Sequence, residues 1–249
     1  MKTLILALIL VGSPLMARAT LPEYLAASCT ALSNRRACGW DACSCELVKE
    51  VAGGSKLLGK AAVLRASDKE QRTVTFNLLI ETNGAWIDYG ELHTAVSGSN
   101  GDESSGSVNR FEMVETLGGG RVLRVDFQSR VTMTNEEQNV RASTSWNGLV
   151  LAFAQGDELA VIELTTMKDT SVSRLNKKGK RPPAKIYGPL GTFRWERDVE
   201  LLDSGRVRVS NRRGTHPIVR KKDLFAGEHA LDGLDRLHAN ELNLRYPEI

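Results

Sequence analysis

Four cysteines near the N-terminus have the best-defined chemistry in the chain: Cys29, Cys38, Cys43 and Cys45. An even count in one short stretch of an exported chain predicts two disulfides. A Cys43–Cys45 bridge would close a strained small ring, so two pairings remain: Cys29–Cys43 with Cys38–Cys45, or Cys29–Cys45 with Cys38–Cys43. The spacing lacks the paired C-x2-C knuckles of structural zinc sites. No C-x-x-C redox motif in a βαβ setting accompanies it.

The histidines show no catalytic or metal-binding motif. The four are His93, His216, His229 and His238. Nucleophilic catalysis needs a Ser or Cys beside a His that a carboxylate orients, and neither G-x-S-x-G nor H-E-x-x-H is present. A C-terminal helix would cluster Glu228, Asp232 and Asp235 but would place His238 among leucines. We therefore predict no catalytic residue, no metal and no cofactor.

Two stretches rich in Lys and Arg, within 171–186 and 204–222, carry the main functional prediction, since neither contains an acidic residue. The predicted anion-binding residues are Arg174, Lys177, Lys178, Lys180, Arg181, Lys185, Arg206, Arg208, Arg212 and Arg213. If the stretches fold together, they form a patch for an anionic polymer or lipid headgroups. If the acidic tail from Asp223 onward folds over them, the charge is satisfied within the chain. The second stretch lacks an aromatic residue to stack on bases, which argues against nucleic acid.

The first 19 residues have the organisation of a cleaved export signal. Lys2 precedes the apolar run 4–11, and Ala17-Arg18-Ala19 provides an A-x-A cleavage site. The apolar run is far shorter than the ~20 residues that a membrane-spanning helix needs. Cleavage lowers the formal charge by two from +3, so net charge indicates no partner. We predict a secreted or periplasmic protein that begins at Thr20 and has no transmembrane span.

The residues after the signal predict one helix. Thr20-Leu-Pro-Glu23 is a capping box, and Leu25, Cys29 and Leu32 follow at helical spacing. A helix over about 21–35 would therefore be stapled by the cysteines. We predict that residues 20–59 form a Cys-rich helical N-terminal cap.

From about residue 60 the hydrophobic period changes to two, which is typical of strands. Residues 74–80 alternate apolar and polar, and Asn83-Gly84 after them is a strong hairpin signal. In 121–133 the apolar face is predicted to hold Leu123, Val125, Phe127, Val131 and Met133, and the opposite face to be wet.

Further turns divide the rest of the chain into short strands. They are predicted at Gly118-Gly119-Gly120, Asn135–Gln138, Asn147-Gly148, Gly156-Asp157 and Asp203-Ser204-Gly205, with a polar loop over 97–107 and a basic linker over 171–183. The predicted fold is mainly β: an antiparallel meander over 60–222, forming a β-sandwich or an up-and-down barrel. Residues 223–249 are predicted to be an acidic, Leu-rich tail that is helical or irregular.

The composition of the 249 residues, 41% hydrophobic and 25% charged, excludes a collagen, a disordered protein and a small disulfide scaffold. We expect an exported, non-catalytic β-protein that binds or scaffolds in the cell envelope or outside the cell, with an anionic polymer, a lipid headgroup or an envelope protein as partner. Two alternatives stay open. One is a carrier of an apolar ligand in a barrel-like cavity. The other is a hydrolase with an unidentified site.

Overall fold

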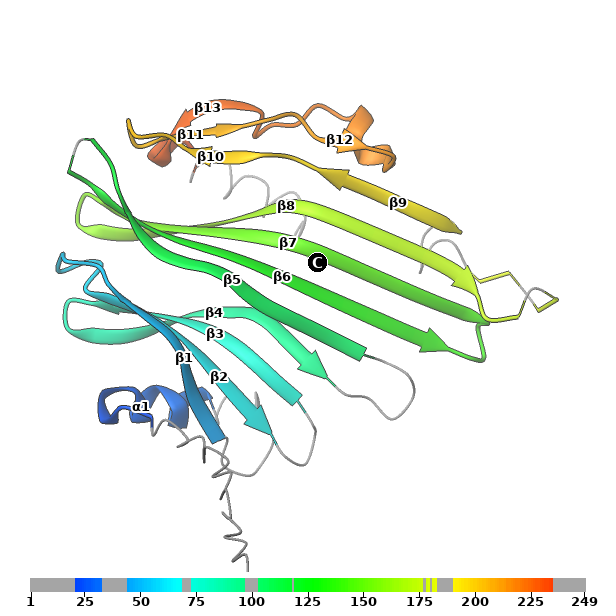
Figure 1. Cartoon of the computed structure of the whole chain (residues 1–249), viewed down its shortest axis with the longest axis horizontal. Coiled ribbons are helices and arrows are strands. Elements are labelled where there is room, and N and C mark those ends of the chain that lie inside the picture. Colours follow the sequence, from blue (N-terminus) through cyan, green and yellow to red (C-terminus); the bar gives the residue numbers. More distant parts are fainter. Residues whose placement is uncertain are drawn as a thin grey trace, which may run out of the picture.

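The described part of the chain contains an N-terminal α-helix and three antiparallel sheets, which are stacked in layers (Figure 1). The computed structural model describes residues 21–32, 44–68, 73–96, 103–117, 119–176, 178–179, 181–182 and 190–234. Within these ranges no helix is both long and apolar enough to cross a membrane. The predicted class, a mainly antiparallel β fold with a disulfide-linked N-terminal helix and a short C-terminal helical turn, is confirmed.

The N-terminal sheet has the strand order β1-β2-β3-β4, with β1 (Ser44–Ala52), β2 (Lys60–Asp68), β3 (Thr73–Thr82) and β4 (Ala85–Val96). The central sheet has the order β12-β9-β8-β7-β6-β5, with β5 (Glu103–Glu115), β6 (Arg121–Asn135), β7 (Val140–Gln155), β8 (Glu158–Arg174), β9 (Gly191–Glu196) and β12 (Arg213–Gly214). The C-terminal sheet has the order β10-β11-β13, with β10 (Val199–Leu201), β11 (Arg206–Val209) and β13 (Gly227–Ala230). The helical segments are α1 (Glu23–Leu32), the 3-10 helix η2 (Pro217–Arg220) and a turn over 231–234.

Three hydrophobic clusters bind the layers together. The first fills the space between the N-terminal and central sheets and includes Leu78 and Ile80 from β3 with Leu123 and Phe127 from β6. The second lies on the opposite face of the central sheet, beneath the C-terminal sheet. We call this second face of the central sheet the outer face. The third cluster packs Leu25 of α1 against the free face of the N-terminal sheet.

The helix α1 is fixed to the N-terminal sheet by apolar and by polar contacts. Leu25 is fully buried, while the Tyr24 ring stacks on Trp86 of β4 with ring centroids 5.8 Å apart. The Tyr24 hydroxyl donates a hydrogen bond to the Glu50 carboxylate of β1, and the Lys60 ammonium lies 4.9 Å from the centre of the Tyr24 ring. These contacts give a ten-residue helix the tertiary support that it needs, since short helices are marginal alone.

The predicted hairpin at Asn83-Gly84 agrees with the structure, and the predicted apolar face of β6 agrees in the first half of the strand. Asn83 and Gly84 have φ values of 53° and 80°, the left-handed values that a two-residue hairpin turn demands. Leu123, Val125 and Phe127 are buried, as their alternation predicted. Met133, expected on the same buried face, is half exposed. The prediction fails there because the cluster between the N-terminal and central sheets includes Leu123, Val125 and Phe127 but no residue of the last part of β6.

The opposite face of β6 is not uniformly wet, contrary to the sequence prediction. At one end of the strand Val122 is buried beneath the C-terminal sheet together with residues from β7 and β8. Towards the other end the polar residues remain, and Thr132 among them is almost fully buried. Strand alternation indicates which residues share a face, but it does not indicate which part of that face a later sheet will cover.

The predicted turn at Asn147-Gly148 is wrong, because both residues lie inside β7, which runs unbroken over Val140–Gln155. Gly148 pairs directly with Phe127 of β6. A Cβ atom on residue 148 would lie 2.1 Å from Cζ of the Phe127 ring. The glycine therefore provides space for an aromatic ring on the neighbouring strand. This requirement explains the glycine at position 148 without a turn.

Several predicted loops are shorter than expected because strands extend into them. The structure begins β5 at Glu103, inside the predicted polar loop, and ends β8 at Arg174, inside the predicted basic linker. The N-terminal segment predicted as a helical cap also contains β1. The predicted C-terminal tail contributes β13 to the C-terminal sheet, so Glu228 stands on a strand and does not share a helix with Asp232.

Candidate functional site

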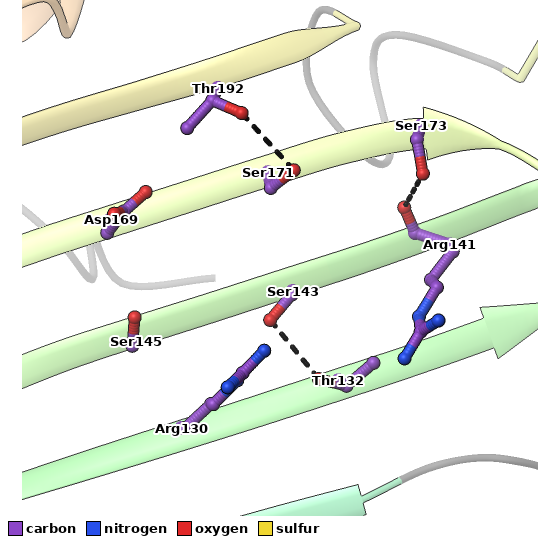
Figure 2. A pocket seen from close by; sticks show the side chains of 9 residues that line it. All are labelled: Arg130, Thr132, Arg141, Ser143, Ser145, Asp169, Ser171, Ser173 and Thr192. Carbon is purple, nitrogen blue, oxygen red and sulfur yellow. Dashed lines mark hydrogen bonds between the residues drawn. The ribbon is translucent and has the colours of Figure 1, made fainter.

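A polar pocket of about 420 Å³ lies on the outer face of the central sheet (Figure 2). It occupies the part of β6, β7 and β8 that lies away from the cluster beneath the C-terminal sheet. The lining comes from four adjacent strands and consists of Arg130, Thr132, Arg141, Ser143, Ser145, Asp169, Ser171, Ser173 and Thr192. No aromatic or aliphatic side chain lines it, so its chemistry is that of hydroxyl, guanidinium and carboxylate groups.

A β-bulge in β8 brings the third strand's polar residues to this face. Asn147 and Gly148 are consecutive on β7 but pair with Met167 and Thr165, which leaves Thr166 as an extra residue in β8. A bulge reverses the alternation of a strand beyond it. Before the bulge, the outer face of β8 therefore carries even-numbered apolar residues such as Ile162 and Leu164. After the bulge, the same face carries the odd-numbered polar residues Asp169, Ser171 and Ser173.

Arg197 holds the bulge from the neighbouring segment. Its Nε donates to the Thr165 carbonyl at 2.9 Å, and its backbone N–H donates to the Thr166 carbonyl at 2.8 Å. The guanidinium group is buried against Phe225 and lies 3.1 Å from the Asp223 carboxylate through Nη1. The bulge that orients Asp169, Ser171 and Ser173 toward the pocket is thus held by a residue of a buried ion pair.

The floor of the pocket is a row of four hydroxyl groups, which we call the hydroxyl row: Thr132, Ser143, Ser171 and Thr192. They are cross-strand partners on β6, β7, β8 and β9. Thr132 donates to Ser143 at 3.1 Å, and Thr192 donates to Ser171 at 3.3 Å. Since a hydroxyl group has one proton to donate, Ser143 and Ser171 keep theirs for a ligand, whereas Thr132 and Thr192 have used theirs within the row.

Two arginines, Arg130 and Arg141, flank the hydroxyl row from opposite sides, and we call them the cationic pair. On one side of the hydroxyl row, Arg130 is the cross-strand partner of Ser145. On the other side, Arg141 is the cross-strand partner of Ser173. Figure 2 shows both side chains reaching toward Thr132 and Ser143. Over the described part of the chain, neither guanidinium group has an ion pair or hydrogen bond, so ten N–H donors stay available to a bound anion.

The predicted anion-binding residues of the second basic stretch lie elsewhere, beside carboxylates. Arg206 lies 2.6 Å from Glu228, and Arg208 lies 3.2 Å from Glu200. Arg212 is nearly buried, 3.4 Å from Asp223. The sequence left open whether the acidic segment that begins at Asp223 folds over the second basic stretch. Two residues of that segment, Asp223 and Glu228, contact arginines of the stretch.

Arg213 is the most heavily engaged of these residues. It lies 2.6 Å from Asp198 and 3.1 Å from Glu196. Hydrogen bonds from Arg213 are the main reason that the pKa of Asp198 lies below its ordinary value. The pKa of Glu196 is lowered by hydrogen bonds from Arg194 first and Arg213 second, and the pKa of Arg213 is raised by the same two carboxylates. These arginines already have anionic partners.

Arg174 of the first basic stretch lies at the far end of β8, away from the second stretch. Arg174 is the last residue of that strand, whereas Arg206 and Arg208 lie on β11 over the other half of the sheet (Figure 1). The chain beyond β8 is clasped by Asn139, whose side chain donates to the Asn176 carbonyl at 2.8 Å and accepts from the Asn176 N–H at 2.6 Å. Lys178 and Arg181 are exposed, while Lys177, Lys180 and Lys185 lie outside the described residues.

Two histidines have structural roles in the described part of the chain. Nδ1 of His216 accepts from the Ile218 N–H at 3.1 Å and caps η2, and Nε2 of His229 lies 2.9 Å from the Phe225 carbonyl. The side chain of His93 and all of His238 lie outside the described residues. Within the ranges that the structure covers, no group of three His, Cys, Asp or Glu residues could hold a metal ion.

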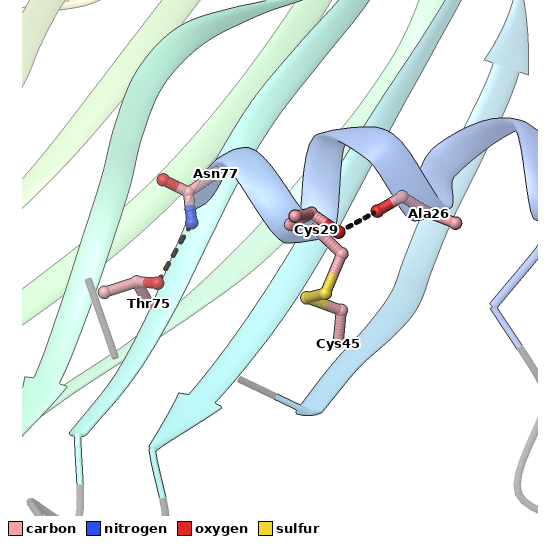
Figure 3. Close-up of a disulfide and its surroundings, with 6 residues drawn as sticks. Ala26, Cys29, Cys45, Thr75 and Asn77 are labelled. Carbon is pink, nitrogen blue, oxygen red and sulfur yellow. Dashed lines mark hydrogen bonds between the residues drawn. A yellow bond between two sulfur atoms is a disulfide. The ribbon is translucent and has the colours of Figure 1, made fainter. Parts of the chain in front are cut away.

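The structure contains one disulfide in the described residues, between Cys29 of α1 and Cys45 of β1, with Cα atoms 6.0 Å apart (Figure 3). This bond belongs to one of the two pairings left open by the sequence and excludes the other. Its remaining partners, Cys38 and Cys43, lie outside the described residues. The bond ties the helix to the edge strand of the N-terminal sheet.

Sequence reasoning missed the pocket. Thr132 and Arg130 were assigned to a wet strand face, and Ser171 and Ser173 to a linker. The available signal was the period-two pattern of Ser and Thr in 141–145 and 169–173, flanked by single charges. That pattern is shared by ordinary solvated strands.

Comparison with known proteins gives no relative for this chain. No protein-family model, no curated protein and no solved structure matches it.

Proposed function

We propose that this protein is an exported, non-catalytic binding protein whose outer-face pocket binds an oxyanion. The observation that carries the proposal is the cationic pair, two guanidinium groups that flank the hydroxyl row and have no anionic partner among the described residues. Charge-assisted hydrogen bonds from arginine to an oxyanion are roughly twice as strong as neutral ones and can be bidentate. An anion placed beside Ser143 would meet both arginines and the Ser143 hydroxyl, which accepts from Thr132 and keeps its own proton to donate.

The contrast with the other arginines supports this assignment. Arg206, Arg208 and Arg213 are exposed like the cationic pair, yet each lies within 3.2 Å of a carboxylate. Arg130 and Arg141 face hydroxyl groups instead. A protein gains little stability from two unpaired positive charges on one face, so a ligand is the better explanation of their placement.

A binding role is favoured over catalysis by the chemistry of the lining. The pocket contains serines, but no histidine is among its described lining residues, and the described bond of Ser143 is to a threonine. Activation of a serine nucleophile requires an adjacent base. The alternative of an apolar-ligand carrier is less well supported, because Leu78, Leu123 and Phe127 pack between the N-terminal and central sheets.

Export is supported by the signal-like first 19 residues and by the Cys29–Cys45 bond, because disulfides persist mainly in oxidising compartments. Intact-mass measurement of the protein from its native source tests this part. The mature chain should begin at Thr20, and a mature chain that retains Met1 would contradict export by a cleaved signal.

Titration with inorganic phosphate, followed by NMR at constant ionic strength, tests the pocket. The amide signals of Thr132, Ser143 and Ser171 should shift saturably, together with the side-chain Nε–H signals of the cationic pair. The Arg130→Gln/Arg141→Gln variant should lose the response. Arg220→Gln, which removes an exposed arginine outside the pocket, should keep it. Equal shifts in the double variant and the wild type would refute the assignment.

A further inference from the structure

The pocket also contains a carboxylate, that of Asp169, which would repel a bound anion. Asp169 is half-buried on β8, beyond Ser145 in the same cross-strand row as Arg130. In the described residues it has no ion pair or hydrogen bond. Its other neighbour across the sheet is Arg194 of β9, but the Arg194 guanidinium lies 2.7 Å from Glu196. An unpaired carboxylate thus lines the same pocket as two unpaired guanidinium groups.

We propose, on the basis of the oxyanion site above, that the ligand is a phosphate ester that carries a primary amine, of the phosphoethanolamine type. The phosphate lies between Arg130 and Arg141, and the ammonium group lies against Asp169. A purely anionic ligand would be repelled by Asp169, and a neutral polyol would leave both arginines unpaired. A ligand with both charges satisfies all three side chains, since each charge gains an opposite partner.

The spacing of the strands suits a short zwitterion. Arg130 and Asp169 are separated by one intervening strand, so their backbones lie about 10 Å apart, twice the spacing of neighbouring strands. Charge-assisted contacts of about 2.8 Å at each end, together with the reach of both side chains, leave room for a small molecule between them. Ser145 lies between the two charged residues and can bond to the ester oxygen.

Phosphate fits the donors better than carboxylate does. Two guanidinium groups and the hydroxyl group of Ser143, whose proton is not used in its bond with Thr132, offer more donors than the two oxygens of a carboxylate can accept. A phosphate monoester presents three terminal oxygens and a charge between −1 and −2, which matches two cations, whereas the phosphodiester of a lipid headgroup presents two terminal oxygens and one negative charge. The described lining has no apolar side chain, so acyl chains of a lipid that carries this headgroup would remain outside the pocket.

Calorimetric titration with three soluble probes tests the proposal: ethyl phosphate, O-phosphoethanolamine and ethanolamine. The wild type should bind O-phosphoethanolamine at least about tenfold more tightly than ethyl phosphate, because the amine adds a charge-assisted contact. Ethanolamine alone should bind weakly. Asp169→Asn should remove the preference and leave ethyl phosphate binding equal or tighter. Asp157→Asn, which removes an exposed carboxylate at the β7–β8 turn, should keep the preference.

The outcomes separate this inference from the proposed function. Equal affinity for ethyl phosphate and O-phosphoethanolamine would overturn the role of Asp169 and leave the oxyanion site intact. Failure of both probes to bind the folded protein would overturn both proposals. A vesicle sedimentation assay distinguishes a lipid headgroup from a free phosphate ester. It compares binding to vesicles of phosphatidylethanolamine and phosphatidylcholine with binding to vesicles of phosphatidylglycerol and phosphatidylcholine. Selective binding that Asp169→Asn abolishes supports a lipid headgroup, and soluble binding without vesicle binding supports a free phosphate ester.

Discussion

Arg197 and Asp223 form a buried ion pair, with 3.1 Å between Nη1 and Oδ1 and only 2% of each side chain exposed. The pair connects three parts of the molecule. Arg197 follows β9 and bonds to both carbonyls of the β8 bulge, while Asp223 also accepts from the Phe225 N–H beneath the C-terminal sheet. The packing of the C-terminal segment and the orientation of the pocket lining therefore depend on the same contact.

Asp223→Asn should lower the free energy of unfolding by about 3–5 kcal/mol, because it leaves buried guanidinium charge without its partner. Urea unfolding followed by circular dichroism measures the loss. Asp203→Asn, in the exposed β10–β11 turn, is the matched control and should change stability by less than about 0.5 kcal/mol. A loss at residue 223 as small as that of the control would show that the pair does not fix the bulge.

Phe127 and Gly148 should be energetically coupled. Phe127→Ala should cost about 3–5 kcal/mol, since the side chain is buried between two sheets. Gly148→Ala should cost about 1–3 kcal/mol in the wild type, because its new methyl group would collide with the Phe127 ring. In the Phe127→Ala background the second substitution should cost close to nothing. Additive losses in this double-mutant cycle would mean that the ring does not lie on the glycine.

The Cys29–Cys45 bond should stabilise the fold by about 3 kcal/mol, the value that chain entropy predicts for a loop of this separation, 16 residues. Replacement of both cysteines by serine avoids a free thiol, and the loss is measured by thermal unfolding. Peptide mapping without reductant should recover Cys29 and Cys45 in one linked pair of peptides. Recovery of Cys29 linked to Cys43 would contradict the structure.

His216 should make stability depend on pH. Burial, with a smaller contribution from Lys168, places its pKa below the ordinary value of 6.5. Protonation therefore favours the unfolded chain, so the contribution of His216 to stability is present above about pH 6.5 and falls as the pH decreases toward its lower folded pKa. His216→Asn keeps a capping acceptor but does not titrate. Unfolding free energies at pH 7.5 and 5.5 should differ less in the variant, and an equal or larger difference would exclude this role.

The hairpins and the core were predictable where a local pattern has one physical meaning. Asn83-Gly84 needs left-handed backbone angles, and Leu123, Val125 and Phe127 alternate with polar residues, so the turn and this part of the core followed from the sequence. Asn147-Gly148 carries the same turn signal, but the Phe127 ring on the next strand decides its conformation. Local patterns do not contain that contact, because it joins residues about twenty positions apart.

The pocket was not predictable for a related reason. Thr166 lies between Thr165 and Met167, and nothing in the local sequence marks it as a bulge. Its position is set by the pairing of β8 with β7 and by Arg197, which is distant in sequence. The predicted anion-binding residues were chosen by charge density along the chain, whereas the structure separates arginines by whether a carboxylate lies beside them. Only the three-dimensional arrangement distinguishes Arg130 and Arg141 from Arg206 and Arg208.

The most direct measurement of the central claim, that Arg130 and Arg141 share one bound anion, is a calorimetric double-mutant cycle with O-phosphoethanolamine. Each substitution to Gln should weaken binding at least about tenfold, as expected for loss of a charge-assisted contact. If both side chains hold the same phosphate, the fold-loss of affinity in the double variant should be well below the product of the two single fold-losses. Wild-type affinity in either single variant would contradict the claim.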